Sequence, residues 1–203
     1  NGGCGMEIYM RRRQRGLQFY RKKKGLSMQA VKEVFSWIVL SVLAVFLAFM
    51  VIWAVGLRTN MIGVSMEPGL TNGQGILVNR LKYRFFSPQT GDVVVFLPNG
   101  NQNAHYYVKR VVAVPGQTVL IQDGILYIDG KAQENEEMDL IASAGIAENE
   151  IKLGKDEYFV LGDNCNNSED SRSANVGPVL RSTIVGEAWF HFGNGTDGWG
   201  LIH

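Results

Sequence analysis

The chain has 203 residues, enough for one globular domain and a small appendage. Its net charge of +1 conceals an asymmetry, because residues 1–33 hold nine of the 20 Lys and Arg but only two of the 19 Asp and Glu. Residues 58–203 hold 11 basic and 17 acidic residues, which excludes a protein that binds nucleic acid along its whole length. Two cysteines and three widely separated histidines predict neither a disulfide framework nor a metal site.

An apolar run extends from Val34 to Leu57 and contains no charged residue and no proline. As a helix it would be about 36 Å long, enough to cross a hydrocarbon core of about 30 Å. Trp37 and Trp53 lie near its ends, where aromatic residues mark a membrane interface. The length argues against a buried core helix, and the apolar segment of a cleaved signal peptide is only about 7–15 residues. The run therefore predicts a transmembrane anchor.

Basic residues flank this run mainly on one side, since nine Lys and Arg precede it and only Arg58 closely follows it. The positive-inside rule then predicts a cytoplasmic tail at 1–33, the anchor at 34–57 and an extracytoplasmic domain at 58–203 of a single-pass plasma-membrane protein. A basic cluster could also bind nucleic acid, but its position beside the apolar run favours the topological interpretation. We expect the lipid bilayer as a partner, and no nucleic acid.

Short runs rich in Val and Ile follow one another through the outer domain. They predict strands at 75–81, 92–97, 106–114, 118–122, 125–129, 158–161 and 184–192. Asp123-Gly124 separates two of these runs and is a strong signal for a two-residue hairpin. The acidic stretch 134–150 predicts a short helix or a surface insertion. Because strands and helices do not alternate, we expect a mainly β fold, an antiparallel sheet or partly open barrel, preceded by one transmembrane helix.

Three stretches of this domain contain candidate catalytic residues. They are GVSMEPGL at 63–70, YVKRVVAVPG at 107–116 and GDNCNNSEDSRS at 162–173, with GDVVVF at 91–96 between the first two. In this order behind an apolar run they resemble the motifs of bacterial type I signal peptidases, over roughly residues 34–192. The resemblance implies a membrane-anchored serine endopeptidase that removes signal peptides from exported precursor proteins after small-x-small sites.

Ser65 is the candidate nucleophile and Lys109 the candidate general base. A serine hydroxyl is a poor nucleophile until a base takes its proton, and no histidine stands in a recognisable triad motif. Lys109 lies in an apolar strand, on the same face as Tyr107 and Val111. Burial there would lower its pKa from about 10.4 by about 3–5 units, whereas a solvated edge-strand lysine would stay protonated. By resemblance Ser65 forms the acyl-enzyme and Lys109 is the base, without a metal or cofactor.

The resemblance also implies supporting residues. Ser168 would orient the Lys109 amine by a hydrogen bond, and the backbone N–H of Ser65 would contribute to an oxyanion hole. A salt-bridge network would comprise Asp163, Asp170 and Arg172. The pocket for the residue before the cleaved bond would be lined by Met66, Leu70, Tyr107 and Val108.

Three positions depart from the family pattern. Cys165 replaces the usual arginine, Gly69 replaces the usual threonine, and Gly63 lacks the hydroxyl that some members add to the oxyanion hole. These departures favour one alternative, a catalytically inactive, membrane-tethered binding protein. A specialised Ser–Lys processing peptidase is a second alternative. A third idea, Cys165 as nucleophile, lacks a histidine partner motif.

Overall fold

The structure is a computed structural model that describes residues 27–101, 103–133, 140–193 and 198–202. Most of the predicted basic tail, including Cys4, lies outside the described residues, as do residues 134–139 of the acidic stretch.

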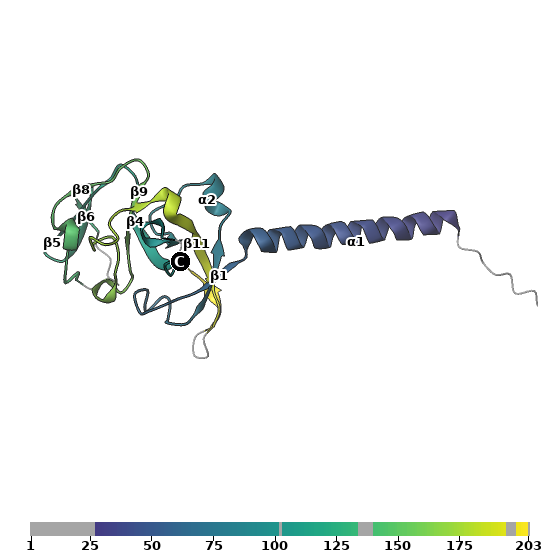
Figure 1. The fold of residues 1–203 in the computed structure, drawn as a ribbon, viewed down its shortest axis with the longest axis horizontal. Helices are drawn as coiled ribbons and strands as arrows, with labels where there is room; N and C mark the ends of the chain where they lie inside the picture. The colour runs from purple at the N-terminus through teal and green to yellow at the C-terminus, as the bar shows by residue number, and fades with distance from the viewer. Residues whose placement is uncertain (1–26, 102, 134–139, 194–197, 203) are drawn as a thin grey trace, which may run out of the picture. The chain divides into compact units, whose positions relative to one another are not determined.

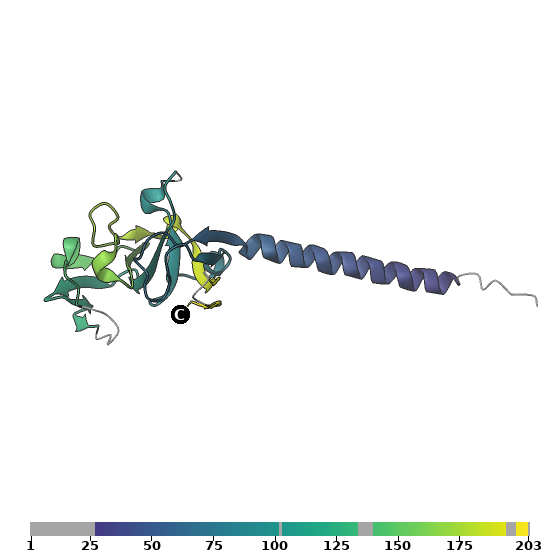
Figure 2. The same cartoon turned by 90° about the horizontal axis from the view of Figure 1, so that it is seen from below.

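Helix α1 (Met28–Val55) contains most of the predicted anchor. The helix begins six residues before the first residue of the predicted run and ends two residues before its last. It ends there because Gly56 interrupts the helix and Leu57 already belongs to a strand. The segment from Met28 to Ile52 has a mean hydropathy of 2.7 and is long and apolar enough to cross a membrane. The large apolar side chains described between Met28 and Ile52 are exposed, and Figure 2 shows this segment as part of α1.

The larger sheet is antiparallel and open. Its strands run in the order β1 (Leu57–Asn60), β2 (Gly75–Asn79), β11 (Ile184–His191), β3 (Val93–Phe96), β4 (Tyr107–Ala113), β9 (Glu157–Leu161) and β10 (Val179–Leu180), and β12 (Gly200–Leu201) also pairs with β11. The seven strands do not close on themselves, because β1 and β10 form the two edges of this order. The predicted mainly β, antiparallel fold is therefore confirmed.

A smaller antiparallel sheet has the order β7 (Lys131–Ala132), β6 (Ile125–Ile128), β5 (Thr118–Gln122) and β8 (Ile151–Lys152). Figure 1 shows β5, β6 and β8 grouped away from β1. The predicted hairpin joins β5 to β6: Gln122 pairs with Ile125, and both residues of the Asp123-Gly124 turn have positive φ angles.

All seven predicted strands occur, with ends that differ by up to two residues. Elements without a sequence signal were not predicted: strand β1, the two-residue strands, and helix α2 (Lys82–Phe85). Four short 3-10 turns complete the description: η1 (Pro98–Gly100), η2 (Gly145–Glu148), η3 (Cys165–Asn167) and η4 (Arg181–Thr183). Turn η2 falls within the acidic stretch, in line with the expected short helix. Such short segments contain too few residues to show a period.

Alternating side chains of the larger sheet enter two different apolar clusters. Val95 and Val108 pack with Met66, whereas Val94 and Val111 pack on the other cluster. Every residue of β3 is buried, as expected for a strand covered on both faces.

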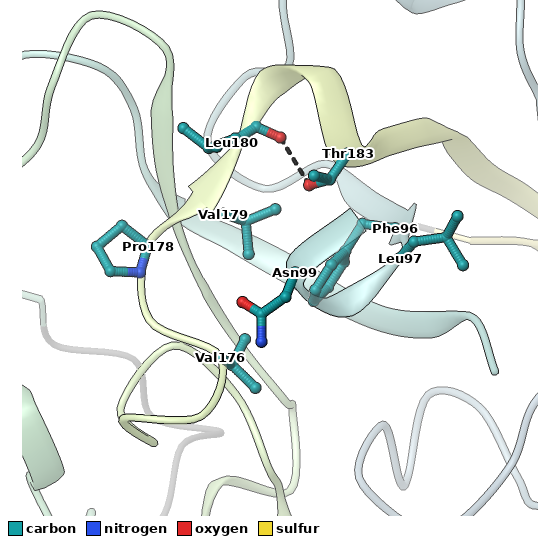
Figure 3. A pocket seen from close by; sticks show the side chains of 8 residues that line it. All are labelled: Phe96, Leu97, Asn99, Val176, Pro178, Val179, Leu180 and Thr183. Carbon is teal, nitrogen blue, oxygen red and sulfur yellow. Dashed lines mark hydrogen bonds between the residues drawn. The ribbon is translucent and has the colours of Figure 1, made fainter. Parts of the chain in front are cut away.

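Beside the second cluster lies a pocket of about 230 Å³, shown in Figure 3. Phe96, Val176 and Val179 give it an apolar lining, and at its edge Thr183 Oγ1 donates to the carbonyl oxygen of Leu180 over 2.8 Å. It contains none of the predicted site residues.

Candidate active site

Ser65 lies in the turn that connects β1 to β2. Hydrophobic burial holds this turn in place, since Met66 and Leu70 are fully enclosed in the core below it. Gly63 adopts φ +87°, a conformation that favours glycine, and its N–H donates to Asn72 Oδ1 over 2.9 Å. The loop is thus fixed on both sides of Ser65, whose side chain is only 7% exposed.

Lys109 lies near the start of β4, where it pairs with Val94 of β3. It is 5% exposed and, within the described residues, forms no ion pair with a carboxylate. Its Nζ lies 2.6 Å from Ser65 Oγ and 5.6 Å from the centre of the Tyr107 ring. The structure therefore brings together the two predicted catalytic side chains, which are 44 residues apart in the chain.

Burial is the main reason that the pKa of Lys109 falls from 10.5 to about 8. The nearby carboxylates of Asp170, Glu169 and Asp163 raise this pKa, and the Arg172 guanidinium lowers it. Desolvation outweighs the three negative charges because none of them contacts the amine directly. A neutral amine is consequently available near physiological pH, as expected for a general base.

The loop between β9 and β10 supports the Ser65 turn from the side. The backbone N–H of Asn164 donates to the Ser65 carbonyl over 3.0 Å, and Asn164 Nδ2 donates to the Val64 carbonyl over 3.2 Å. Gly162 lies where the two segments meet, and a Cβ atom there would clash with the Ser65 carbonyl oxygen and with Ser168 Oγ.

Arg172 and Asp170 form the buried ion pair predicted for this loop. Two parallel hydrogen bonds of 2.8 Å join the guanidinium to the carboxylate. Arg172 also donates to the carbonyl oxygens of Ser143 and Cys165, so that one side chain ties together three parts of the loop region.

Asp163 does not belong to that network. It accepts two hydrogen bonds of 2.8 Å from Arg110, which donates a further bond to the Gly91 carbonyl. Arg110 follows Lys109 in β4 and points to the other face, as strand alternation requires. Instead of one network, the structure has two separate ion pairs.

The predicted hydrogen bond from Ser168 to Lys109 is not formed. Ser168 Oγ is buried and has no partner within the described part of the chain. A buried hydroxyl without a hydrogen bond lowers stability by about 1–3 kcal/mol, so a hydrogen bond formed by this atom would be favourable. It lies near the backbone of Ser65 across Gly162.

A cleft of about 420 Å³ opens at the Ser65–Lys109 pair. Two segments bound it, 61–65 and 105–109, and Asn167 and Glu169 complete its lining. Tyr107 and Val108 line the cleft as predicted. Met66 and Leu70 do not: they belong to the core below it, because their side chains point inward from the turn.

Several residues of the cleft were not predicted. Ile62 and Val64 contribute exposed apolar surface, and His105 lies at its border. Tyr107 Oη donates to Glu169 Oε2 over 3.0 Å. A bond between residues 62 positions apart leaves no local signal in the sequence.

Cys165 is buried, and its Sγ donates to the Gly162 carbonyl. It packs with apolar residues of the smaller sheet's core, and burial raises the pKa of its thiol. The side chain is therefore a packing residue rather than a thiolate. Across the described ranges, no three His, Cys, Asp or Glu side chains lie close enough together to hold a metal ion.

Comparison with known proteins shows the family of this chain. Residues 34–192 match the family described as signal peptidase, peptidase S26. A probable signal peptidase I-1 from Synechocystis is 35% identical over 134 residues, which cover 63% of this chain and 66% of that protein. Signal peptidase IB from Staphylococcus aureus is 32% identical over 183 residues, covering 79% of this chain and 90% of that protein.

Among solved structures, a signal peptidase I from Enterococcus faecalis is 26% identical, with a TM-score of 0.42 over 50% of this chain and 97% of that one. The family match extends over most of this chain and includes the Ser65 turn, β4 and the loop after β9. The chain therefore belongs to the peptidase S26 family of signal peptidases, which are serine endopeptidases that remove signal peptides.

Proposed function

We propose that this chain removes N-terminal signal peptides from exported precursors with Ser65 as nucleophile and Lys109 as general base. One observation carries the proposal: the buried Lys109 amine lies 2.6 Å from the Ser65 hydroxyl at the floor of an open cleft. A lysine with a lowered pKa and no ion pair is suited to accept the proton of a serine hydroxyl.

In the proposed reaction, neutral Lys109 accepts the Ser65 proton as Oγ attacks the carbonyl carbon of the scissile bond. The resulting ammonium gives its proton to the leaving amine, and the mature protein departs. Lys109 then takes a proton from water as the water oxygen attacks the acyl carbonyl carbon. The ammonium gives that proton to Ser65 Oγ as the ester bond breaks, and the signal peptide leaves with a new carboxyl group. Each proton transfer uses the same nitrogen, so no second titrating group is required.

The oxyanion of the tetrahedral intermediate needs hydrogen-bond donors, and one such donor can contribute about 2.7–4 kcal/mol. The Ser65 N–H is the proposed donor, since it forms no hydrogen bond within the ranges that the structure describes. Gly63 supplies no hydroxyl, and its own N–H is occupied by Asn72. Ser168 is proposed as the residue that holds the neutral amine in line once Ser65 is acylated.

The substrate would lie extended between segments 61–65 and 105–109. Tyr107 and Val108 would contact the small residue before the cleaved bond, and the apolar Ile62 and Val64 would contact the signal peptide. Met66 and Leu70 support this surface from below rather than touching substrate.

Helix α1 is proposed as a membrane anchor with residues 1–33 in the cytoplasm and the β domain outside. Its exposed apolar side chains favour a lipid environment. Labelling of Lys131→Cys by a membrane-impermeant reagent in intact cells tests the orientation. If that cysteine were labelled only after the cells are lysed, the β domain would lie in the cytoplasm and the proposed topology would be wrong.

Cleavage of a precursor by the purified full chain in detergent tests the function. Ser65→Ala and Lys109→Ala are expected to lower the rate by at least about 10²-fold, because each removes an essential participant. Lys152→Ala, an exposed lysine in the smaller sheet, is the control and should cleave normally. A parent protein that binds several precursors without cleaving them would instead be a tethered binding protein.

Substrate choice is tested on the same precursor by replacing the alanine at the −1 position with phenylalanine. The cleft should reject the larger side chain and cleavage should fall sharply. Unchanged cleavage would remove the support for a small-residue pocket at Tyr107 and Val108.

A further inference from the structure

Three arginines line a pocket that lies outside the catalytic cleft. Arg80 follows β2, Arg84 lies in α2, and Arg181 begins turn η4, 97 residues further along the chain than Arg84. The pocket has a volume of about 370 Å³, and its remaining lining includes the apolar side chains of Leu81 and Ile184. Three of the 11 basic residues of an otherwise acidic domain thus converge on one cavity.

The positive charge of this pocket is not neutralised by the protein. In the described part of the chain, none of the three arginines lies within ion-pair distance of a carboxylate. Arg181 donates instead to the backbone carbonyls of Tyr83 and Phe86, and its guanidinium stacks 5.4 Å from the Tyr83 ring centre.

The neighbouring Lys82 shows the contrast. Lys82 forms ion pairs with Asp92 at 3.0 Å and with Glu187 at 2.6 Å. These nearby carboxylates therefore pair with Lys82, which does not line the pocket, and not with the three arginines. A pocket lined by guanidinium groups without carboxylates is suited to a phosphate, which arginine binds through paired N–H donors.

Two exposed phenylalanines adjoin the arginines. Phe85 is 76% exposed and Phe86 is 69% exposed, and they are the next two residues after Arg84. Two aromatic rings presented to solvent beside cationic side chains are typical of a segment that lies in a membrane interface. A soluble anion alone would not account for the phenylalanines.

Strand register places the pocket near the point where the chain leaves α1. Leu57, the first residue of β1, follows the last helical residue, Val55, by two positions and pairs with Val78 of β2. Arg80 is two residues beyond Val78. Because two residues span at most about 7 Å, the pocket lies within a short distance of the end of the proposed anchor.

We propose that this pocket binds the phosphate of an anionic phospholipid headgroup while Phe85 and Phe86 enter the interfacial layer. The proposal uses the proposed membrane anchor only for proximity and is independent of the Ser65–Lys109 chemistry. It would give the β domain a second attachment to the bilayer, at the end of the sheet where β1 begins.

Native mass spectrometry of the full chain in detergent tests the proposal with phosphatidylglycerol and phosphatidylcholine of identical acyl chains. We expect preferential retention of phosphatidylglycerol. The variant Arg80→Gln/Arg84→Gln should weaken that retention about 25-fold, on the basis of roughly fivefold for each basic residue. Lys131→Gln/Lys152→Gln, which removes two exposed charges from the smaller sheet, should have little effect.

Phe85→Ser/Phe86→Ser separates the lipid from a free anion. It should weaken retention of phosphatidylglycerol, and millimolar inorganic phosphate should compete poorly with the lipid. Equal retention of the two lipids, equal losses in the two charge variants, or full displacement by inorganic phosphate would overturn the proposal. Precursor cleavage in detergent should be unchanged in all of these variants, so a failed peptidase assay and a failed lipid assay remain distinguishable.

Discussion

Lys109 and Arg172 are two buried cations near the same cleft, and they differ in their partners. Arg172 has a carboxylate at 2.8 Å on two of its nitrogens, and the pKa of its guanidinium is raised despite burial. Lys109 has a hydroxyl at 2.6 Å and no carboxylate contact in the described residues, and burial lowers its pKa to about 8. Burial therefore produces a structural cation when a counter-ion is present and a potential base when it is not.

Replacing Lys109 with arginine should have the largest effect, because it turns the potential base into a second permanent cation. Lys109→Arg keeps a positive charge at the site but cannot lose its proton, because guanidinium titrates above about pH 12. The kcat/KM for a precursor is expected to fall at least 10²-fold, toward the level of Lys109→Ala. Lys152→Arg, at an exposed position of β8, is the matched control for the exchange of these side chains. Substantial activity in Lys109→Arg would show that its charge, and not its basicity, matters.

Removing the counter-ion of Arg172 should produce the next largest effect. Asp170→Ala leaves a buried guanidinium unpaired and should lower the free energy of unfolding by about 3–5 kcal/mol. The double variant Asp170→Ala/Arg172→Met should recover part of that loss, since no isolated charge remains. Denaturant titration of the full chain in detergent, followed by tryptophan fluorescence, measures both.

The more exposed pair Arg110–Asp163 provides the comparison for that experiment, with side chains 26% and 19% exposed. Asp163→Ala should lower the free energy of unfolding less than Asp170→Ala does, because solvent screens the charge of the remaining Arg110. Equal losses at the two positions would mean that burial does not distinguish the pairs.

The pH dependence of cleavage should reveal the lowered pKa of Lys109 directly. Only the neutral amine acts as a base, so kcat/KM should rise about tenfold per pH unit below the pKa and level off above about pH 8. The same shift makes the folded protein bind fewer protons than the unfolded chain between about pH 8 and 10.5, so stability should rise with pH across that window. A rate profile that is flat from pH 6 to 9 would contradict Lys109 as the base.

The exposed carboxylate of Glu169 should have a smaller effect on the pKa of Lys109. Its negative charge raises the pKa of Lys109, and its Oε2 accepts a bond from Tyr107. Glu169→Gln keeps an acceptor for Tyr107 but removes the charge, so the midpoint of the pH–rate profile should move to lower pH. Glu148→Gln, an exposed carboxylate in η2, should leave the midpoint unchanged.

The features predicted from sequence are those with a local signal. The strands, the Asp123-Gly124 hairpin and the apolar helix follow from short-range patterns, and Ser65 and Lys109 follow from motifs. The partner of Asp163 could not be predicted in this way. Arg110 lies 53 positions away, and the motif around Asp163 suggested a network with Arg172 instead.

Side-chain direction was the other source of error. Met66 and Leu70 flank the nucleophile in sequence, but the turn directs them into the core and leaves Ile62 and Val64 at the surface. In a strand the alternation would settle which side chains face the cleft; in a turn with no period it does not. The hydroxyl rotamer of Ser168 is a still finer detail that no pattern of residue types specifies.

The smallest expected effect belongs to Cys165, the position at which the resemblance to the family led us to expect an arginine. Its thiol is buried among apolar side chains, and burial raises its pKa, so it is neither a nucleophile nor a cation. Cys165→Ala should keep kcat/KM within about twofold, since the backbone carbonyl that Arg172 contacts remains in place. Cys165→Arg, in contrast, would place a second guanidinium beside Arg172, where the nearby carboxylates of Asp170 and Asp163 are already paired with Arg172 and Arg110. It should therefore unfold at a lower denaturant concentration than Cys165→Ala. If the arginine variant were instead the more stable and active of the two, the loop of this chain would still accommodate the family's charge, and the cysteine would be a loss of function rather than an alternative packing solution.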